Sequence, residues 1–110
     1  MIQANELRVG NYYDHNGEYR KVTPSTIEEV WNAERTWCKP IPITEDILLK
    51  CGFEKFTTKD IYPTYVNKLF NWNDGILYLV GYNFINHIKY LHDLQNLYFA
   101  LTKTELTINL

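Results

Sequence analysis

The sequence predicts a single α+β domain over residues 1–110, with a small antiparallel sheet and two short helices packed against it. Hydrophobic residues make up 45% of the chain and charged residues 22%, which is the ordinary balance of a globular protein. Short β-favouring runs separated by turn residues predict the sheet, or a partly closed, SH3-like barrel in its place. Apolar residues at helical spacing predict the two helices, and no repeat or linker divides the chain.

The first element is a predicted hairpin. Leu7 to His15 and Glu18 to Thr23 are β-favouring runs, and Asn16-Gly17 lies between them. Asn-Gly is the strongest short hairpin signal, because both residues tolerate positive φ in a type I′ turn. Gly10 inside the first run indicates a bulge or a bend.

The next segment, Pro24 to Trp37, fits two interpretations. Ser25 has a glutamate three residues later, which is capping-box spacing, and Ile27, Val30 and Trp31 share one helical face. The same stretch is rich in β-branched and aromatic residues, which suit a third strand. Local pattern favours the helix slightly.

The two helices packed on the sheet come later. Two prolines keep Lys39 to Ile43 extended, and Thr44 then fits the N-cap of a helix over Glu45–Cys51. Gly52 is expected to end this helix with positive φ. A second helix is predicted over His92–Thr102, where leucines recur at spacings of three and four. Its residues expected to be largely buried are Leu94, Leu97 and Leu101.

The remaining β-favouring runs surround a tight turn at Asn73-Asp74-Gly75. They are Phe53–Thr58, Tyr65–Trp72, Ile76–Val80 and Tyr82–Ile88. Leu106–Leu110 alternates and is compatible with a final strand.

Two segments and the opening of the chain resemble a known family. The segments are KPIPITEDILLKCGFEK, Lys39 to Lys55, and IKYLHDLQNLYFALTKTELTI, Ile88 to Ile108; the opening is NELRVGNYY. They resemble small uncharacterised proteins encoded by gut bacteroidetes and their phages or prophages, over somewhat under half of the chain. The resemblance implies an accessory protein of phage or mobile-element origin and assigns no active site. Such proteins usually carry glycine where this sequence has Lys103.

Charge and cysteine usage limit the class of protein. Net charge is −2, from 11 basic and 13 acidic residues mixed along the chain. This balance weakens the case for nucleic acid or an anionic membrane as partner. No apolar stretch approaches the roughly 20 residues of a membrane span, and no signal peptide is recognisable at the start. Two cysteines, Cys38 and Cys51, fit a reducing compartment, so we expect a cytoplasmic protein.

No catalytic or metal-binding motif is recognisable. The metal-ligand candidates by residue type lack the close-spaced pairs of structural zinc sites; they are Cys38, Cys51, His87 and His92. Cys51 falls at the C-terminal end of a short helix, where the dipole opposes thiolate formation. Neighbouring carboxylates on a helix do not face each other, and phosphate-binding glycine loops are absent from the sequence. The sequence therefore predicts no metal, no cofactor and no enzymatic activity.

Nucleic-acid binding by a small β-barrel module is the alternative function. The opening hairpin resembles that of SH3-like barrels, some of which bind RNA or DNA. Its basic and aromatic residues are Arg8, Arg20, Lys21, Tyr12, Tyr13 and Tyr19. Aromatic rings with basic neighbours can stack bases, although tyrosines that cover a small sheet explain the same pattern. The negative net charge favours this second explanation.

The candidate binding residues are Trp31, Arg35 and Trp37, in the least regular part of the chain. Binding groups tend to lie on loops held by a rigid scaffold, and tryptophan beside arginine is typical of an interface hot spot. We therefore expect a non-enzymatic protein in which at least one of these tryptophans contacts a protein partner or a second copy of the chain. The alternative is that both rings cap the open end of the sheet.

Overall fold

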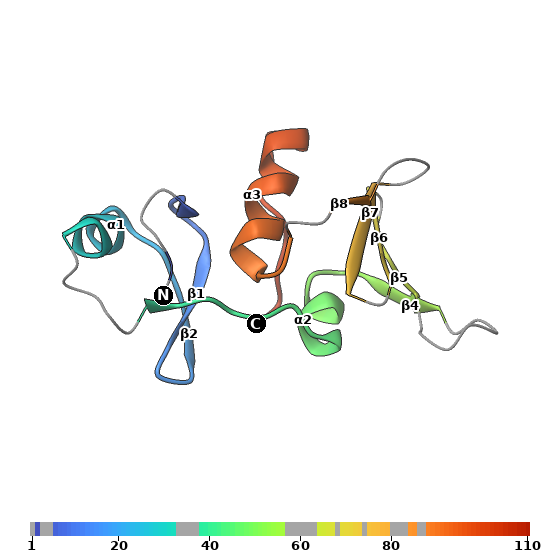
Figure 1. The fold of residues 1–110 in the computed structure, drawn as a ribbon, viewed down its shortest axis with the longest axis horizontal. Coiled ribbons are helices and arrows are strands. Elements are labelled where there is room, and N and C mark those ends of the chain that lie inside the picture. Colours follow the sequence, from blue (N-terminus) through green and yellow to red (C-terminus); the bar gives the residue numbers. More distant parts are fainter. Residues whose placement is uncertain are drawn as a thin grey trace. The chain divides into compact units, whose positions relative to one another are not determined.

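In the residues that it describes, the computed structural model has an α+β architecture with three helices and two antiparallel sheets (Figure 1). It describes residues 2, 6–32, 38–56, 64–67, 69–73, 75–79, 84–85 and 88–110. These divide into two compact units, which are described in turn. Unit 1 spans Met1–Pro42 and Tyr90–Leu106, and unit 2 spans Ile43–Lys89 and Thr107–Leu110. The α+β prediction is confirmed, but the β-favouring runs form two sheets instead of one.

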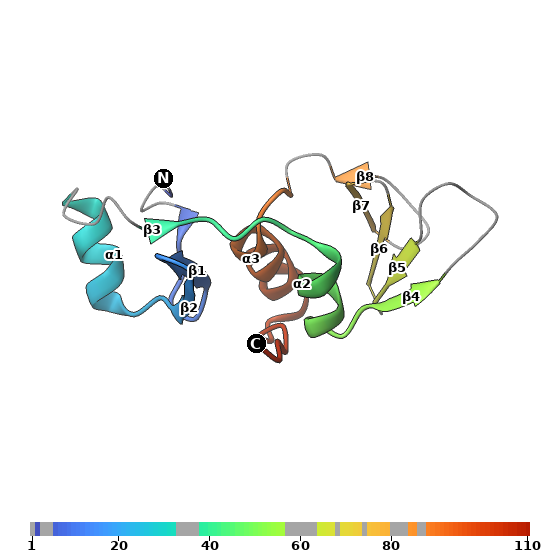
Figure 2. The ribbon, with the colours of Figure 1, turned by 90° about the horizontal axis from the view of Figure 1, so that it is seen from below.

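The sheet of unit 1 is an open antiparallel sheet of three strands in the order β2-β1-β3 (Figure 2). β1 (Tyr12–His15) pairs with β2 (Glu18–Lys21) on one side and with β3 (Cys38–Lys39) on the other. Asn16 and Gly17 join β1 to β2 with φ of 51° and 92°, which confirms the hairpin and its turn. The outer strand β2 is exposed along its whole length. Within the described residues β2 and β3 do not pair with each other, so the expectation of a barrel was wrong.

A bulge precedes β1, as Gly10 indicated. The Gly10 N–H donates to the Val22 carbonyl at 3.0 Å, and the Val22 N–H donates to the Asn11 carbonyl at 2.7 Å. Two residues of one segment therefore face one residue of the other. The φ of 97° at Gly10 is the left-handed value that this geometry requires.

The ambiguous segment begins with a helix, α1 (Pro24–Trp31). Its cap lies two residues earlier than Ser25: Thr23 Oγ1 accepts the Thr26 N–H at 3.3 Å, and Thr26 Oγ1 accepts the Thr23 N–H at 3.2 Å. Pro24 occupies the first turn, where its missing N–H costs nothing. Capping and proline placement thus outweigh the β-propensity that supported a strand.

The core of unit 1 combines residues of α1 with residues of the sheet. Its members are Ile2, Tyr13, Val22, Val30 and Cys38, with Leu7 and Ile27 packed against them. Tyr13 and Cys38 lie on the same face of the sheet, since Cys38 is opposite His15 and side chains alternate along β1. This face is the one that α1 covers.

The C-terminal helix of unit 1, α3 (Leu91–Thr102), confirms the predicted helix. Its buried residues are Leu91, His92, Leu94 and Gln95. Leu94 is buried as expected and Leu97 is half-buried, but Leu101 is 50% exposed, so its predicted burial was wrong. The buried face of α3 includes two polar side chains, His92 and Gln95, because α3 packs against the rest of unit 1 partly through hydrogen bonds.

Lys103 ends α3 in a conformation that favours glycine. Its φ is 62° and its ψ is 17°, and its N–H donates to the Phe99 carbonyl at 2.8 Å. A residue with a Cβ is strained there by roughly 1 kcal/mol. We expect Lys103→Gly to raise the free energy of unfolding by about 0.5–1 kcal/mol in urea denaturation. Thr104→Gly, at an ordinary φ, is the control and should destabilise; equal losses in both variants would contradict the prediction.

Unit 2 begins with α2 (Glu45–Lys50), and the local prediction of this helix holds. Thr44 Oγ1 accepts the Ile47 N–H at 3.3 Å as its N-cap. At the other end Gly52 has φ of 84°, and the Phe53 N–H donates to the Leu48 carbonyl at 3.0 Å. This is the Schellman ending that a glycine at this position predicts.

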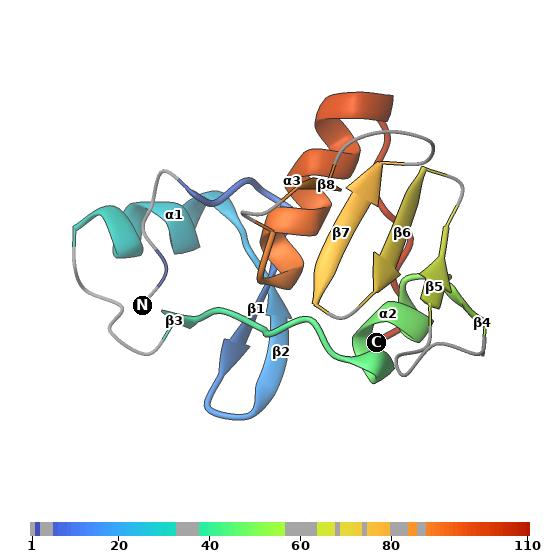
Figure 3. The ribbon, with the colours of Figure 1, turned by 45° about the vertical axis from the view of Figure 1, so that its right-hand side comes forward.

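The described residues of unit 2 then form a sheet of five short antiparallel strands. The order of the strands in this sheet is the same as their order along the chain. They are β4 (Glu54–Phe56), β5 (Thr64–Val66), β6 (Phe70–Asn73), β7 (Ile76–Leu79) and β8 (Phe84–Ile85). Figure 3 shows β6 and β7 side by side, joined across the turn at which Asn73 faces Ile76.

Two strand predictions in unit 2 were wrong. Tyr65–Trp72 is not one strand but parts of β5 and β6, because the chain turns at Asn67. The Asn67 N–H donates to the Phe70 carbonyl at 2.8 Å, and Asn67 Oδ1 accepts the Leu69 N–H at 3.2 Å. Residues 106–110 form no strand, and the Asn109 N–H donates to the Lys50 carbonyl at 2.9 Å instead.

Candidate binding surface

Trp31 is the most exposed large hydrophobic side chain that the structure describes, with 75% of its surface accessible. It is the last residue of α1, and its neighbour Val30 is buried in the core. Ile27 and Val30 pack in the core, but Trp31, which shares their helical face by spacing, is the last residue of α1 and lies exposed. The exposed ring therefore departs from the helical face that the spacing predicts.

The surroundings of Trp31 are acidic. Glu28 is exposed one turn before it, and α1 contains no basic residue. The C-terminal end of a helix also carries partial negative charge. We call the exposed end of α1, formed by Glu28, Trp31 and Asn32, the Trp31 surface. It combines a large apolar ring with a negative border.

The other two predicted binding residues, Arg35 and Trp37, lie outside the described residues. The Trp31 ring is exposed, as a residue that contacts a partner requires. An exposed ring does not cap the open end of a sheet, so that alternative does not apply to Trp31. A contact between Trp31 and a partner stays a prediction.

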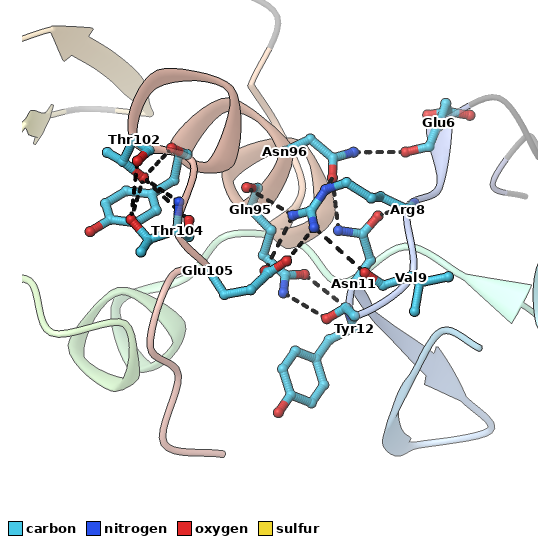
Figure 4. Close-up of polar contacts among 12 residues, drawn as sticks. Glu6, Arg8, Val9, Asn11, Tyr12, Gln95, Asn96, Thr102, Thr104 and Glu105 are labelled. Atoms are coloured by element: carbon cyan, nitrogen blue, oxygen red, sulfur yellow. Dashed lines mark hydrogen bonds and ion pairs between the residues drawn. The ribbon is translucent and has the colours of Figure 1, made fainter. Parts of the chain in front are cut away.

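Gln95 of α3 replaces a missing strand partner at the start of β1 (Figure 4). Its side-chain Oε1 accepts the Tyr12 N–H at 2.8 Å, and its Nε2 donates to the Gly10 carbonyl at 3.1 Å. Only 1% of Gln95 is exposed. One buried amide thus satisfies two backbone groups at the bulge and fixes α3 to β1.

Asparagines extend this network on both sides. Asn11 Oδ1 accepts the Arg8 N–H at 2.7 Å, and Asn11 Nδ2 donates to Asn96 Oδ1 at 2.8 Å. Asn96 Nδ2 in turn donates to the Glu6 carbonyl at 2.9 Å. The segment before β1 is therefore held against α3 by directional polar contacts.

Arg8 is part of the same structural network. Its guanidinium lies 4.3 Å from the centre of the Phe99 ring and forms a two-point ion pair with Glu105, with Nη2 and Oε2 3.2 Å apart. Figure 4 shows this side chain extending toward α3 and Glu105. Arg8 is thus committed to contacts within unit 1.

The structure therefore leaves fewer residues of the hairpin available for the nucleic-acid binding that the sequence suggested. Tyr13 is buried, and Arg20 pairs with Glu18 at 3.3 Å. The described members that remain accessible on one face are Tyr12, Tyr19 and Lys21, with Lys21 Nζ 5.6 Å from the centre of the Tyr12 ring.

Neither cysteine is placed for nucleophilic chemistry. Cys38 and Cys51 are both buried cysteine thiols, and they lie in different units. Burial raises the pKa of the Cys51 thiol to about 12, so the thiolate that a nucleophile requires does not form near neutral pH.

The four candidate metal ligands do not form a set in the described residues. His87 lies outside these residues, and His92 lies in a cluster with Glu6 and Asp93 that includes neither cysteine. Sequence reasoning considered His92 but missed both carboxylates. Asp93 is its neighbour in sequence, whereas Glu6 is 86 residues away and gives no local signal.

A second polar cluster links α2 to the sheet of unit 2. Lys55 Nζ lies 2.7 Å from Glu45 Oε1. Hydrogen bonds from Lys55 and Tyr65 hold the pKa of Glu45 below its usual value, and Glu45 raises the pKa of Lys55. Burial and then the Glu45 hydrogen bond raise the pKa of Tyr65. All three shifts move titration away from neutral pH, so this cluster is suited to stability and not to proton transfer.

A hollow of about 350 Å³ lies on unit 2. It is lined by Gly52, Glu54, Phe56, Val66 and Asn67. Among the described lining residues only Glu54 is ionisable, so these residues do not bring together an acid and a base.

No protein-family model, curated protein or solved structure matches the chain. Among the described residues, no helix combines the length and apolar character needed to cross a membrane.

Proposed function

We propose that the chain is a non-enzymatic accessory protein of the cytoplasm, of phage or mobile-element origin, that binds a protein partner through the Trp31 surface. The observation that carries the proposal is the 75% exposure of Trp31 at the end of a well-capped helix. Tryptophan is among the residues most enriched in interface hot spots. The resemblance of two segments to proteins of gut bacteroidetes and their phages supports the origin.

The local structure of α1 supports a preformed contact. The reciprocal Thr23–Thr26 cap holds the start of the helix, and burial of Thr26 and Val30 anchors one face. A side chain that projects from a rigid element loses less entropy on binding than one on an unstructured segment.

The charge around Trp31 favours protein over nucleic acid at this surface. Between Pro24 and Trp37 the chain carries three glutamates and one arginine. Phosphates would be repelled there, whereas a protein pocket with a basic border would be attracted. The partner we propose is therefore a protein with an apolar pocket bordered by lysine or arginine.

The ionisable groups support a non-enzymatic role. The Cys51 pKa of about 12 opposes thiolate chemistry, and the Glu45 cluster is held away from titration near neutral pH. Both features are explained by packing and stability.

The test compares affinity purifications from the native host with three baits: the wild-type chain, Trp31→Ala and Tyr19→Ala. Tyr19 is an exposed aromatic residue of the same unit and serves as the matched control. We expect a protein that is retained by wild type and by Tyr19→Ala but lost with Trp31→Ala. The melting midpoint of Trp31→Ala should barely move, since an exposed side chain contributes within about 0.5 kcal/mol.

Two outcomes would count against this proposal. Equal retention of every captured protein by Trp31→Ala and wild type would exclude the Trp31 surface as the contact. Concentration-dependent sedimentation of the purified chain that Trp31→Ala abolishes would identify a second copy of the chain, and not another protein, as the occupant.

Nucleic acid is the second candidate, supported by the accessible Tyr12, Tyr19 and Lys21 on one face of the β1–β2 hairpin. Stacking on exposed tyrosine combined with a nearby ammonium suits a single strand. This alternative predicts oligonucleotide binding that weakens steeply with salt and is lost in Tyr19→Ala but kept in Trp31→Ala.

A further inference from the structure

A buried histidine in unit 1 lies between two carboxylates. His92, in the first turn of α3, has none of its surface exposed. Its Nε2 is 3.4 Å from Glu6 Oε1 and 3.5 Å from Asp93 Oδ1. All three ligand-type atoms lie within 4.8 Å of one another.

The hydrogen bonds available to His92 are poor for a buried ring. Nitrogen–oxygen hydrogen bonds are usually about 2.7–3.2 Å long, and both Nε2 separations exceed this range. The other ring nitrogen, Nδ1, has no hydrogen-bond partner among the described residues. Buried polar atoms nearly always have a partner. Nε2, the nitrogen that faces the two carboxylates, therefore has no short hydrogen bond to either of them, whereas Nδ1 faces another side of the ring and takes no part in the cluster.

The two nitrogen–oxygen separations suit ligands that share one metal ion. Zinc binds histidine nitrogen and carboxylate oxygen at about 2.0–2.2 Å in tetrahedral geometry, so two such ligands are about 3.3–3.6 Å apart. The observed values of 3.4 and 3.5 Å fall inside this range. Distances that are long for hydrogen bonds are thus ordinary for atoms that share an ion.

Neighbouring contacts orient the side chains of Asp93 and His92 and hold the backbone of Glu6. The Tyr90 N–H donates to Asp93 Oδ2 at 3.2 Å, which fixes this carboxylate with Oδ1 near the imidazole. The Tyr90 ring stacks on His92 with centroids 5.9 Å apart and planes 6° apart. Asn96 holds the Glu6 backbone through its hydrogen bond to the Glu6 carbonyl. Such supporting contacts are typical of metal ligands.

We propose that Glu6, His92 and Asp93 form a three-ligand site for a divalent first-row transition-metal ion such as Zn²⁺, with a remaining position open to water. Two carboxylates offset the charge of the ion, and an imidazole ligand disfavours Mg²⁺ and Ca²⁺. The ion would join the segment before β1 to α3. This site departs from the expected absence of a metal, because its ligands are not the cysteines and histidines that the spacing argument considered.

The test adds Zn²⁺ to the full-length chain after removal of metals by a chelator. Calorimetry should show about one Zn²⁺ bound per chain, and thermal unfolding should shift to higher temperature. Glu6→Gln and Asp93→Asn should each bind Zn²⁺ about tenfold more weakly or worse. Glu28→Gln, at an exposed carboxylate of the same unit, should bind like wild type. Mg²⁺ should produce no shift.

Co²⁺ distinguishes this site from a cysteine site. Bound Co²⁺ should give the visible absorption of a tetrahedral ion without a thiolate charge-transfer band. A thiolate band, no Zn²⁺ binding by wild type, or wild-type affinity in Glu6→Gln would each overturn the proposal. Glu6 is partly exposed and the substitution keeps its shape, so Glu6→Gln remains decisive even if Asp93→Asn fails to fold.

Discussion

Replacing Leu94 by alanine is expected to lower the free energy of unfolding by about 2–5 kcal/mol, as measured by urea denaturation. Leu94 is fully buried on α3, so truncation removes apolar contacts and leaves a cavity. Leu101, on the same helix but half-exposed, is the matched control. Leu101→Ala should cost less than about 1 kcal/mol. Equal losses for the two leucines would mean that the face of α3 buried in unit 1 is misassigned.

Replacing Gln95 by leucine should have an effect of similar size, although the two side chains are close in shape. The leucine leaves the Tyr12 N–H and the Gly10 carbonyl without their Gln95 partners, at about 1–3 kcal/mol for each buried group. We therefore expect Gln95→Leu to lose about 2–6 kcal/mol in the same denaturation experiment.

Asn109 offers the comparison for this second prediction, because its side chain is exposed and its backbone N–H donates to the Lys50 carbonyl. Asn109→Leu should change stability by less than about 0.5 kcal/mol. A small loss for Gln95→Leu would show that the contact between α3 and β1 does not depend on the buried amide.

The local elements of the fold could be predicted because their signals lie within a few residues. Asn16-Gly17 specifies a turn by backbone sterics alone, and Gly52 ends α2 for the same reason. The failed predictions have two different causes: one is a local turn inside a β-favouring run, and the other depends on how far along α3 the packing extends. The turn at Asn67 interrupts an apparently continuous β run, and Leu101 follows the helical period but lies beyond the buried part of α3.

The candidate sites also differ in whether the sequence carries a local signal for them. Trp31 could be singled out from sequence because it lies in the least regular part of the chain, and the structure places it at an exposed helix end. The Glu6–His92 contact joins residues 86 positions apart, and the Gln95 bonds join residues 83 and 85 apart. Periodicity and spacing carry no information on such contacts, which arise only when α3 packs beside the start of β1.

The most direct measurement for the Trp31 surface is the dissociation constant of the purified partner for three forms of the chain: wild type, Trp31→Ala and Tyr19→Ala. A central tryptophan hot spot contributes about 2 kcal/mol or more, so Trp31→Ala should weaken binding about 30-fold or more. Tyr19→Ala should bind as wild type does. A Trp31→Ala dissociation constant equal to that of wild type, with the melting midpoint unchanged, would contradict the proposal that this protein binds through Trp31.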